Sequence, residues 1–444
     1  MNDPSFVFPN DPHVPWSIMI VLYPYITGLV AGAFVVSALY HVFHQQVLRP
    51  VARLALVTAL CFCACATLPL LLHLHHPERA FNIMITPSAT SAMSGFGVIY
   101  NLYMLLLVVE VWLVFRADIV ARAQSTAGWT GVLYRLLSLG DREITDKARA
   151  VDDWLIRALA MVGIPAACVL HGYVGFLFGA VKANPWWSTA LMPIIFLASA
   201  VVSGIAALIA LYLFCCWRRR VSPDAACVQA MSRYLWISLI VAVSLEMLEL
   251  VHMAYESGAE WHVLSTLLTE RLAVSYGVVQ VLIGSVCPFL LLVLAIQPRL
   301  NARLMTRLSA VASVLILVQV FAMRWNVVVG GQLFSKSFRG FVEYPLHIGG
   351  REGLLAAAVV LVLPLFALRA AAGLLPLWQS EQDSNSTADQ NPAPVSPDHM
   401  EIKTPDPLQL SAATRQGNIL DEETSEESDI SDYAAAFRNE NEHV

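Results

Sequence analysis

Polar and ionisable side chains interrupt three of the long apolar segments in this sequence. One segment has a histidine near its middle and a Lys-Ala-Asn-Pro-Trp-Trp run at its end, the second has two glutamates and a histidine spaced three apart, and the third ends in arginine and asparagine. Charged groups are costly inside membrane-spanning helices, so they usually face a cavity and mark a path for ions, protons or a ligand. The residues concerned are His171, Lys182 and Trp186, then Glu246, Glu249 and His252, then Arg324 and Asn326, with Gln332 shortly after.

A carboxylate beside a histidine suits proton exchange, and an arginine can hold a carboxylate ionised or stabilise an anionic intermediate. Amides and a tryptophan add hydrogen bonds and a flat apolar surface. Such a set suits a lipid-soluble quinone, which needs an apolar cleft with polar groups at its two carbonyls and whose reduced form releases two protons and two electrons. We therefore predict as catalytic residues His171, Glu246, Glu249 and His252, and as quinone-binding residues His171, Lys182, Trp186, Arg324, Asn326 and Gln332.

The carboxylates allow other interpretations. Glu246 or Glu249 could pair with Arg324 and simply tie helices together. Glu110 stands alone in another apolar segment. It is either an isolated buried carboxyl or a proton relay toward the cytoplasm that acts with Glu246 and Glu249.

The bulk composition indicates what positions these residues. Apolar residues make up 57% of the 444 positions and charged residues only 14%, which is typical of a polytopic membrane protein. Nine apolar segments reach the roughly 20 residues needed to cross a bilayer. Because lipid offers the backbone no hydrogen-bond partner, we predict an all-α membrane protein made of helical bundles. The segments are 17–43, 52–74, 96–116, 154–181, 188–217, 234–256, 276–296, 308–330 and 352–377.

Basic residues predict the orientation. They cluster in alternate loops, from Arg49 and Arg53 after the first segment to Arg303 and Arg307 before the eighth, whereas none precedes the first segment. The positive-inside rule therefore places the N-terminus outside and the C-terminus in the cytoplasm, as nine crossings require. Segment 17–43 lacks a basic n-region and a small-residue cleavage site, so we expect it to be retained.

The end of the chain has a different composition. Its last 66 positions hold 15 acidic and three basic side chains and few apolar ones, so they cannot bury enough surface to offset their chain entropy. The sequence thus predicts three parts: a short periplasmic N-terminus (1–15), a transmembrane domain (16–378) and a disordered acidic cytoplasmic tail (379–444).

The longest inner loop, residues 117–152, places apolar residues between arginines. They are Ile119, Val120, Trp129, Val132, Leu133, Leu136 and Leu137. That spacing predicts a short helix lying on the inner membrane surface.

The sequence lacks the usual signs of a metal site. Eight cysteines lie mostly inside apolar segments, whereas iron–sulfur ligands normally come from a Cys-rich loop. For haem, His252 is the one plausible partner of His171, which keeps a b-type cytochrome as a minor alternative. We expect no metal, haem or iron–sulfur cluster in this chain, and no nucleic-acid partner.

The polar stretches resemble the NrfD/PsrC family, the polysulfide-reductase-type membrane subunits of bacterial and archaeal redox complexes. The matching stretches are His171 to Ser188, then Met192-Pro193-Ile194-Ile195-Phe196 with Ser203-Gly204, and Met323 to Gln332. The likeness covers roughly residues 15–377 and leaves the acidic tail unmatched. Members of the family with eight and with ten helices exist, and nine helices fit neither number.

The resemblance implies a haem-free subunit that reacts with quinone or quinol, menaquinone or ubiquinone, near the outer face of the bacterial cytoplasmic (inner) membrane. Electrons would pass to or from a ferredoxin-like iron–sulfur subunit that serves a molybdopterin-containing or similar catalytic subunit. The predicted function is that of an integral membrane subunit of a respiratory redox complex, with proton translocation left open. The alternative is a secondary transporter or ion channel that uses the intramembrane Glu/His/Arg cluster.

Overall fold

A computed structural model of the chain describes residues 14–184, 186–333 and 341–378. The predicted acidic tail and most of the predicted N-terminal segment lie outside these ranges. The first part of the chain forms α1 (Ile18–His41), η1 (Gln46–Leu48), α2 (Arg49–Ala66), α3 (Leu68–His73), η2 (Pro77–Arg79), α4 (Asn82–Ile85), α5 (Ala92–Ser125), α6 (Gly128–Leu137) and α7 (Asp146–Gly179). The second part forms α8 (Met192–Arg219), α9 (Ala225–Glu256), α10 (Ala259–Thr266), η3 (Leu267–Arg271), η4 (Ala273–Val286), α11 (Cys287–Ala295), α12 (Ala302–Val328), η5 (Gly330–Gln332) and α13 (Leu354–Leu374).

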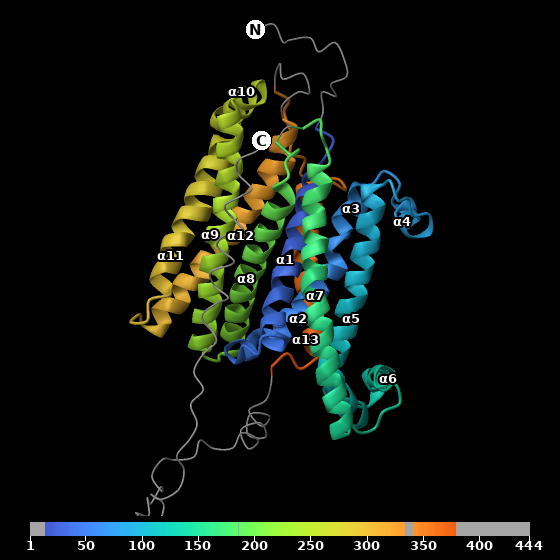
Figure 1. The fold of residues 1–444 in the computed structure, drawn as a ribbon. Coiled ribbons are helices and arrows are strands. Elements are labelled where there is room, and N and C mark those ends of the chain that lie inside the picture. The colour runs from blue at the N-terminus through green and yellow to red at the C-terminus, as the bar shows by residue number, and fades with distance from the viewer. Residues whose placement is uncertain (1–13, 185, 334–340, 379–444) are drawn as a thin grey trace, which may run out of the picture. The chain divides into compact units, whose positions relative to one another are not determined.

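The described residues form helices without a β-strand, which confirms the all-α prediction. Within the described ranges, nine helices are long and apolar enough to cross a membrane, and each overlaps one predicted segment. Successive long helices run in opposite directions (Figure 1). We call the end of the bundle that carries Trp16 and Gly331 the Trp16 end, and the opposite end, near Arg116, the Arg116 end.

Helix α1 is the centre of the bundle. It packs against α2, α7, α8 and α12, with α9 and α11 on one side and α5 on the other (Figure 1). Its most apolar window is 94% buried, compared with 22% for α9 and for α13. A helix that is apolar all round and buried on every side is what the middle of a membrane bundle requires.

Two glycines allow α1 and α8 to touch. A Cβ added at Gly32 would lie 2.6 Å from Cα of Gly204, so the two backbones are in direct contact. Small residues at such crossings let membrane helices approach closely, because packing drives their association.

Replacing Gly32 by Leu should therefore separate α1 from α8 and lower the free energy of unfolding by more than ~2 kcal/mol. The measurement is the melting temperature in mild detergent together with the monodisperse fraction in gel filtration. Gly373→Leu is the matched control, since a Cβ at Gly373 meets no atom within 4 Å. Wild-type behaviour of the Gly32→Leu protein would contradict the assigned contact.

Helices α5 and α7 extend further at the Arg116 end than the predicted segments 96–116 and 154–181. The apolar stretch of α5 ends where charged residues become frequent. The helix continues past them because these charged side chains have partners. Asp118 lies 3.1 Å from Arg53, and Arg122 donates to the carbonyl oxygen of Leu374 at 2.6 Å. Two of the residues assigned to the surface helix, Ile119 and Val120, therefore belong to α5 and are buried.

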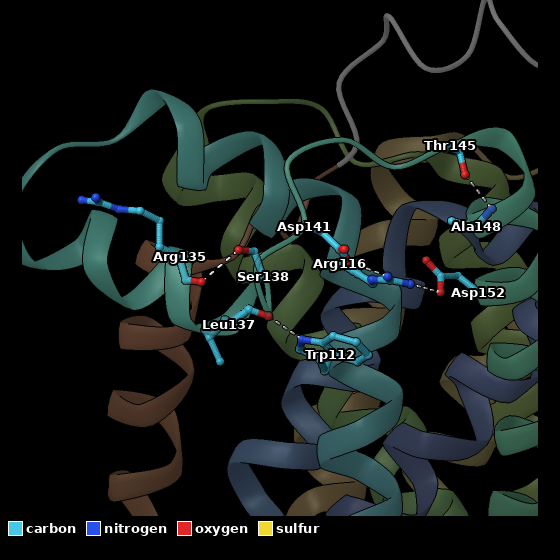
Figure 2. A network of polar contacts seen from close by, with 9 residues as sticks. All are labelled: Trp112, Arg116, Arg135, Leu137, Ser138, Asp141, Thr145, Ala148 and Asp152. Atoms are coloured by element: carbon cyan, nitrogen blue, oxygen red, sulfur yellow. Dashed lines mark hydrogen bonds and ion pairs between the residues drawn. The ribbon is translucent and has the colours of Figure 1, made fainter.

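The predicted loop contains one short helix, α6, and its position on the membrane surface stays a prediction. Figure 2 shows the contacts that hold α6 in place. The Arg116 guanidinium, on α5, lies 2.6 Å from the carboxylates of both Asp141, in the loop that follows α6, and Asp152, on α7. Trp112 Nε1 donates to the carbonyl oxygen of Leu137 at 2.9 Å. The exposed residues of α6 include Trp129, which suits contact with a membrane surface.

Candidate functional site

Three residues that follow α7, Asn184, Trp186 and Trp187, pack at the Trp16 end, and we call them the plug. Asn184 Nδ2 donates to the carbonyl oxygen of Gly331 at 2.7 Å, and Trp187 Nε1 donates to that of Val327 at 2.7 Å. Trp187 also stacks on Trp16, with the ring centroids 4.9 Å apart. These contacts dock the loop between α7 and α8 onto the end of α12, so Asn184 and Trp187 build the scaffold around the site.

Arg324 is fully buried where α12 meets α8 and α7. Its Nη2 donates to the carbonyl oxygen of Phe196 at 3.1 Å and to Ser199 Oγ at 2.6 Å. The guanidinium carbon lies 3.7 Å from the centroid of the Phe196 ring, a cation–π contact. Among the described residues no carboxylate lies within 4.0 Å of this guanidinium, so the interpretation that Arg324 forms a close ion pair with Glu246 or Glu249 is wrong.

His171 faces the same guanidinium from α7. Its Nε2 lies 3.5 Å from Nη2 of Arg324, a long contact in which only the histidine can accept, because arginine has no acceptor atom. This assigns the ring proton to Nδ1, which is buried without a partner among the described residues.

Glu246, Gln280 and Asn326 form a hydrogen-bonded chain across α9, η4 and α12. Gln280 Nε2 donates to Glu246 Oε2 at 3.0 Å, and Asn326 Nδ2 donates to Gln280 Oε1 at 2.7 Å. The direction of this chain follows from the carboxylate, which accepts and so fixes both amide orientations.

A narrow cavity of about 40 Å³, which we call the Glu246 cavity, lies beside this chain. Glu246, Glu249 and Asn326 all line it, and each has one buried oxygen with no hydrogen-bond partner in the described structure. Buried polar atoms are rarely left unpaired, so three unpaired acceptors around one cavity indicate a place for a ligand that donates hydrogen bonds. Trp186, Tyr276 and Met323 contribute apolar walls.

A larger cavity, the Lys182 cavity, adjoins the first. It has a volume of about 870 Å³, within the range of ~300–1,000 Å³ common for sites of small organic ligands. Glu249 and Met253 line both cavities, so these two side chains stand between them. His252 also lines the larger cavity and lies 3.5 Å from Glu256, with both side chains exposed.

The structure thus divides the predicted site residues into groups. Glu246, Glu249, Trp186 and Asn326 line the Glu246 cavity, whereas Lys182 and His252 line the Lys182 cavity with Glu249. His171 and Arg324 meet each other but line neither cavity.

The remaining two predicted residues lie elsewhere. Gln332 holds the backbone of Trp16, whose N–H donates to Gln332 Oε1 at 3.1 Å. Glu110 lies on α5, fully buried, and neither of its carboxyl oxygens has a hydrogen-bond partner among the described residues.

Sequence reasoning missed Gln280, although a glutamine inside an apolar segment was a visible signal. It did not identify Ser199, and it named Phe196 only within a matching stretch, because their contacts with Arg324 depend on how α8 faces α12. Gln280 lies in η4, a π-helix that covers Ala273–Val286. Helices of this type are rare and often occur at functional sites.

Comparisons with known proteins identify the family of this chain. The family model described as polysulphide reductase, NrfD matches residues 7–336. A selenate reductase subunit of Mesobacillus selenatarsenatis is 38% identical over 205 residues, 45% of this chain and 48% of that protein. The chain therefore aligns with about half of that relative's length.

Two more distant relatives extend the comparison. Protein NrfD of Escherichia coli is 28% identical over 222 residues, 49% of this chain and 65% of that protein. The Hdr-like menaquinol oxidoreductase integral membrane subunit of Archaeoglobus fulgidus is 22% identical over 336 residues, 75% of each chain. Because the family model covers most of the transmembrane bundle, this multi-pass membrane protein belongs to the NrfD family.

Proposed function

We propose that this chain is the integral membrane subunit of a respiratory redox complex, in which it exchanges electrons between membrane quinol and an iron–sulfur partner. The observation that carries the proposal is the group of three unpaired acceptor oxygens, on Glu246, Glu249 and Asn326, around one cavity. The two hydroxyl groups of a quinol are donors that suit such acceptors. One relative of the chain is named a menaquinol oxidoreductase subunit, which supports menaquinol as the first candidate.

The cavities suggest how the ligand reaches these acceptors. The Glu246 cavity, at about 40 Å³, has room for about one water molecule and none for a quinone ring, whereas the Lys182 cavity has ample room. A ring in the larger cavity would meet Glu249 first and would approach Glu246 once Met253 turns aside. Methionine side chains are unbranched and flexible, so this movement is inexpensive.

The chain's residues then have distinct roles. A bound quinol supplies two electrons and two protons on oxidation. Glu246 and Glu249 accept the protons as general bases, Asn326 and Gln280 fix the Glu246 carboxylate, and Trp186 provides an apolar wall. Arg324, which His171 contacts, places a fixed positive charge behind the site. Lys182 and His252 line the Lys182 cavity, through which the quinol would enter, whereas Gln332 holds Trp16, on which Trp187 stacks.

The proposed partners are a ferredoxin-like iron–sulfur subunit and a catalytic subunit with molybdopterin or a similar group. Mild-detergent purification from native bacterial inner membranes, with mass spectrometry of co-purifying proteins and assays for iron and haem, tests this. We expect a cluster-binding subunit, iron and no haem. Recovery of the chain alone, without iron and with solute uptake in liposomes, would favour a transporter instead.

Glu110 is proposed as a proton relay between the site and the cytoplasm. A buried carboxyl without a partner is unfavourable for stability, which indicates a retained functional use. Glu110→Gln keeps the volume but cannot carry a proton. In proteoliposomes that contain the whole complex, we expect the proton-to-electron ratio to fall to that of quinol chemistry alone, with turnover lowered less than about 10-fold.

The matched control for this measurement is Glu143→Gln, an exposed carboxylate in the loop between α6 and α7. It should leave the ratio unchanged. A Glu110→Gln complex that moves as many protons per electron as the wild type would refute the relay.

A further inference from the structure

A third cavity opens at the Arg116 end, remote from the site above. It lies between the end of α8, the loop that follows and the start of α12, and has a volume of about 850 Å³. We call it the arginine cavity. Its polar lining comprises Arg218, Arg220, Ser222, Thr306 and Arg307, beside Trp217.

The three arginines of this cavity are exposed, and none makes a side-chain hydrogen bond or ion pair with another residue of the described ranges. Some other arginines at the same end do have carboxylate partners. Arg53 lies 3.1 Å from Asp118, and Arg116 lies 2.6 Å from both Asp141 and Asp152. Three unneutralised guanidinium groups around one cavity repel each other, so they indicate an anionic ligand.

The surfaces beside the cavity are apolar. On α8, Phe214 and Trp217 are 56% and 71% exposed, and on α12, Val311 and Val314 are 51% and 53% exposed. In a membrane-spanning bundle, such side chains face the acyl chains of lipids. The ligand that fits both surfaces therefore carries an anionic group at one end and a long apolar part at the other.

We propose that the arginine cavity binds the phosphate headgroup of an anionic phospholipid. Arg218, Arg220 and Arg307 contact the phosphate, the Ser222 hydroxyl donates a hydrogen bond, and the acyl chains lie along the exposed apolar faces of α8 and α12. The Thr306 hydroxyl already donates to the carbonyl oxygen of Ala302 at 2.8 Å. The positive-inside rule places this end in the cytoplasmic leaflet, which is rich in anionic lipid and attracts basic groups.

The test is a lipid titration of the delipidated full-length chain followed by native mass spectrometry. The probes are phosphatidylglycerol and phosphatidylcholine with identical acyl chains. The cavity variant combines Arg218→Gln, Arg220→Gln and Arg307→Gln, and the matched control combines Arg149→Gln, Arg299→Gln and Arg303→Gln, which removes the same charge from exposed arginines outside the cavity. We expect the first phosphatidylglycerol to bind about 100-fold more weakly to the cavity variant. The control should change this affinity less than about threefold, and phosphatidylcholine should show no difference.

Three results would overturn the proposal. Equal loss in the cavity variant and the control would mean a general effect of net charge. Competition by millimolar inorganic phosphate as strong as that by phosphatidylglycerol would indicate a site for free anions. Unchanged lipid binding together with loss of a co-purifying protein from native membranes would show that the arginines contact a protein.

Discussion

Replacing Glu246 by Gln is expected to lower quinol-linked electron transfer by the assembled complex about 100-fold or more, without loss of assembly. The amide oxygen of the new glutamine can still accept from Gln280 Nε2, which lies 3.0 Å from Glu246 Oε2, so the chain to Asn326 persists. What disappears is the proton acceptor, and general-base catalysis typically contributes ~10²–10⁴-fold. The measurement is steady-state oxidation of a short-chain menaquinol, which separates kcat from KM.

The loss should lie in kcat, because the shape of the site and its hydrogen-bond donors are kept. Glu249→Gln should behave similarly, since Glu249 lines both cavities. Glu270→Gln is the control, an exposed carboxylate of η3 that lines neither cavity. If the double variant Glu246→Gln, Glu249→Gln kept full activity, the proposed site would be wrong.

Replacing Arg324 by Met should separate activity from stability. We expect turnover to fall about 100-fold, because a buried positive charge behind the site is removed. Stability should be unchanged or rise on the order of 1 kcal/mol, because a fully buried cation with no close carboxylate is unfavourable for folding. Ser199 and Phe196 stay paired in this variant, since Ser199 Oγ donates to the carbonyl oxygen of Phe196 at 2.9 Å by itself, and His171 Nε2 loses only a long contact of 3.5 Å.

Activity assays and melting temperatures of the same preparation provide this measurement. Arg351→Met, an exposed arginine shortly before α13, is the control and should change neither quantity. A fall in melting temperature with activity retained would show that Arg324 serves packing alone. Arg324→Lys, which keeps the charge but loses the planar fork, should recover only part of the turnover.

The sequence by itself determined the class of protein and the candidate membrane-spanning helices of the described ranges. Long apolar segments leave the backbone no choice but a helix in lipid, so nine segments predicted the nine candidate spans found in the described ranges. It also selected Glu246, Glu249, Arg324 and Asn326, because charged and amide groups in apolar helices are rare enough to stand out. The sequence could not predict where α5 ends or where α7 begins, since Asp118 and Arg122 of α5 and Asp152 of α7 have partners distant in the chain.

Only the tertiary structure decided which polar residues meet. Helical periodicity fixes the face on which a side chain lies but not the helix that this face contacts. Hence Gln280, on η4, could not be placed between Glu246 and Asn326 from the sequence, and Arg324 could not be separated from the carboxylates. Gln332 and Asn184 carry amide side chains of the kind that bind ligands. In the structure, however, Gln332 accepts from the backbone N–H of Trp16, and Asn184 donates to the carbonyl oxygen of Gly331. The physical reason is that hydrogen bonds between helices depend on the rotation and depth of each helix, which packing around α1 sets.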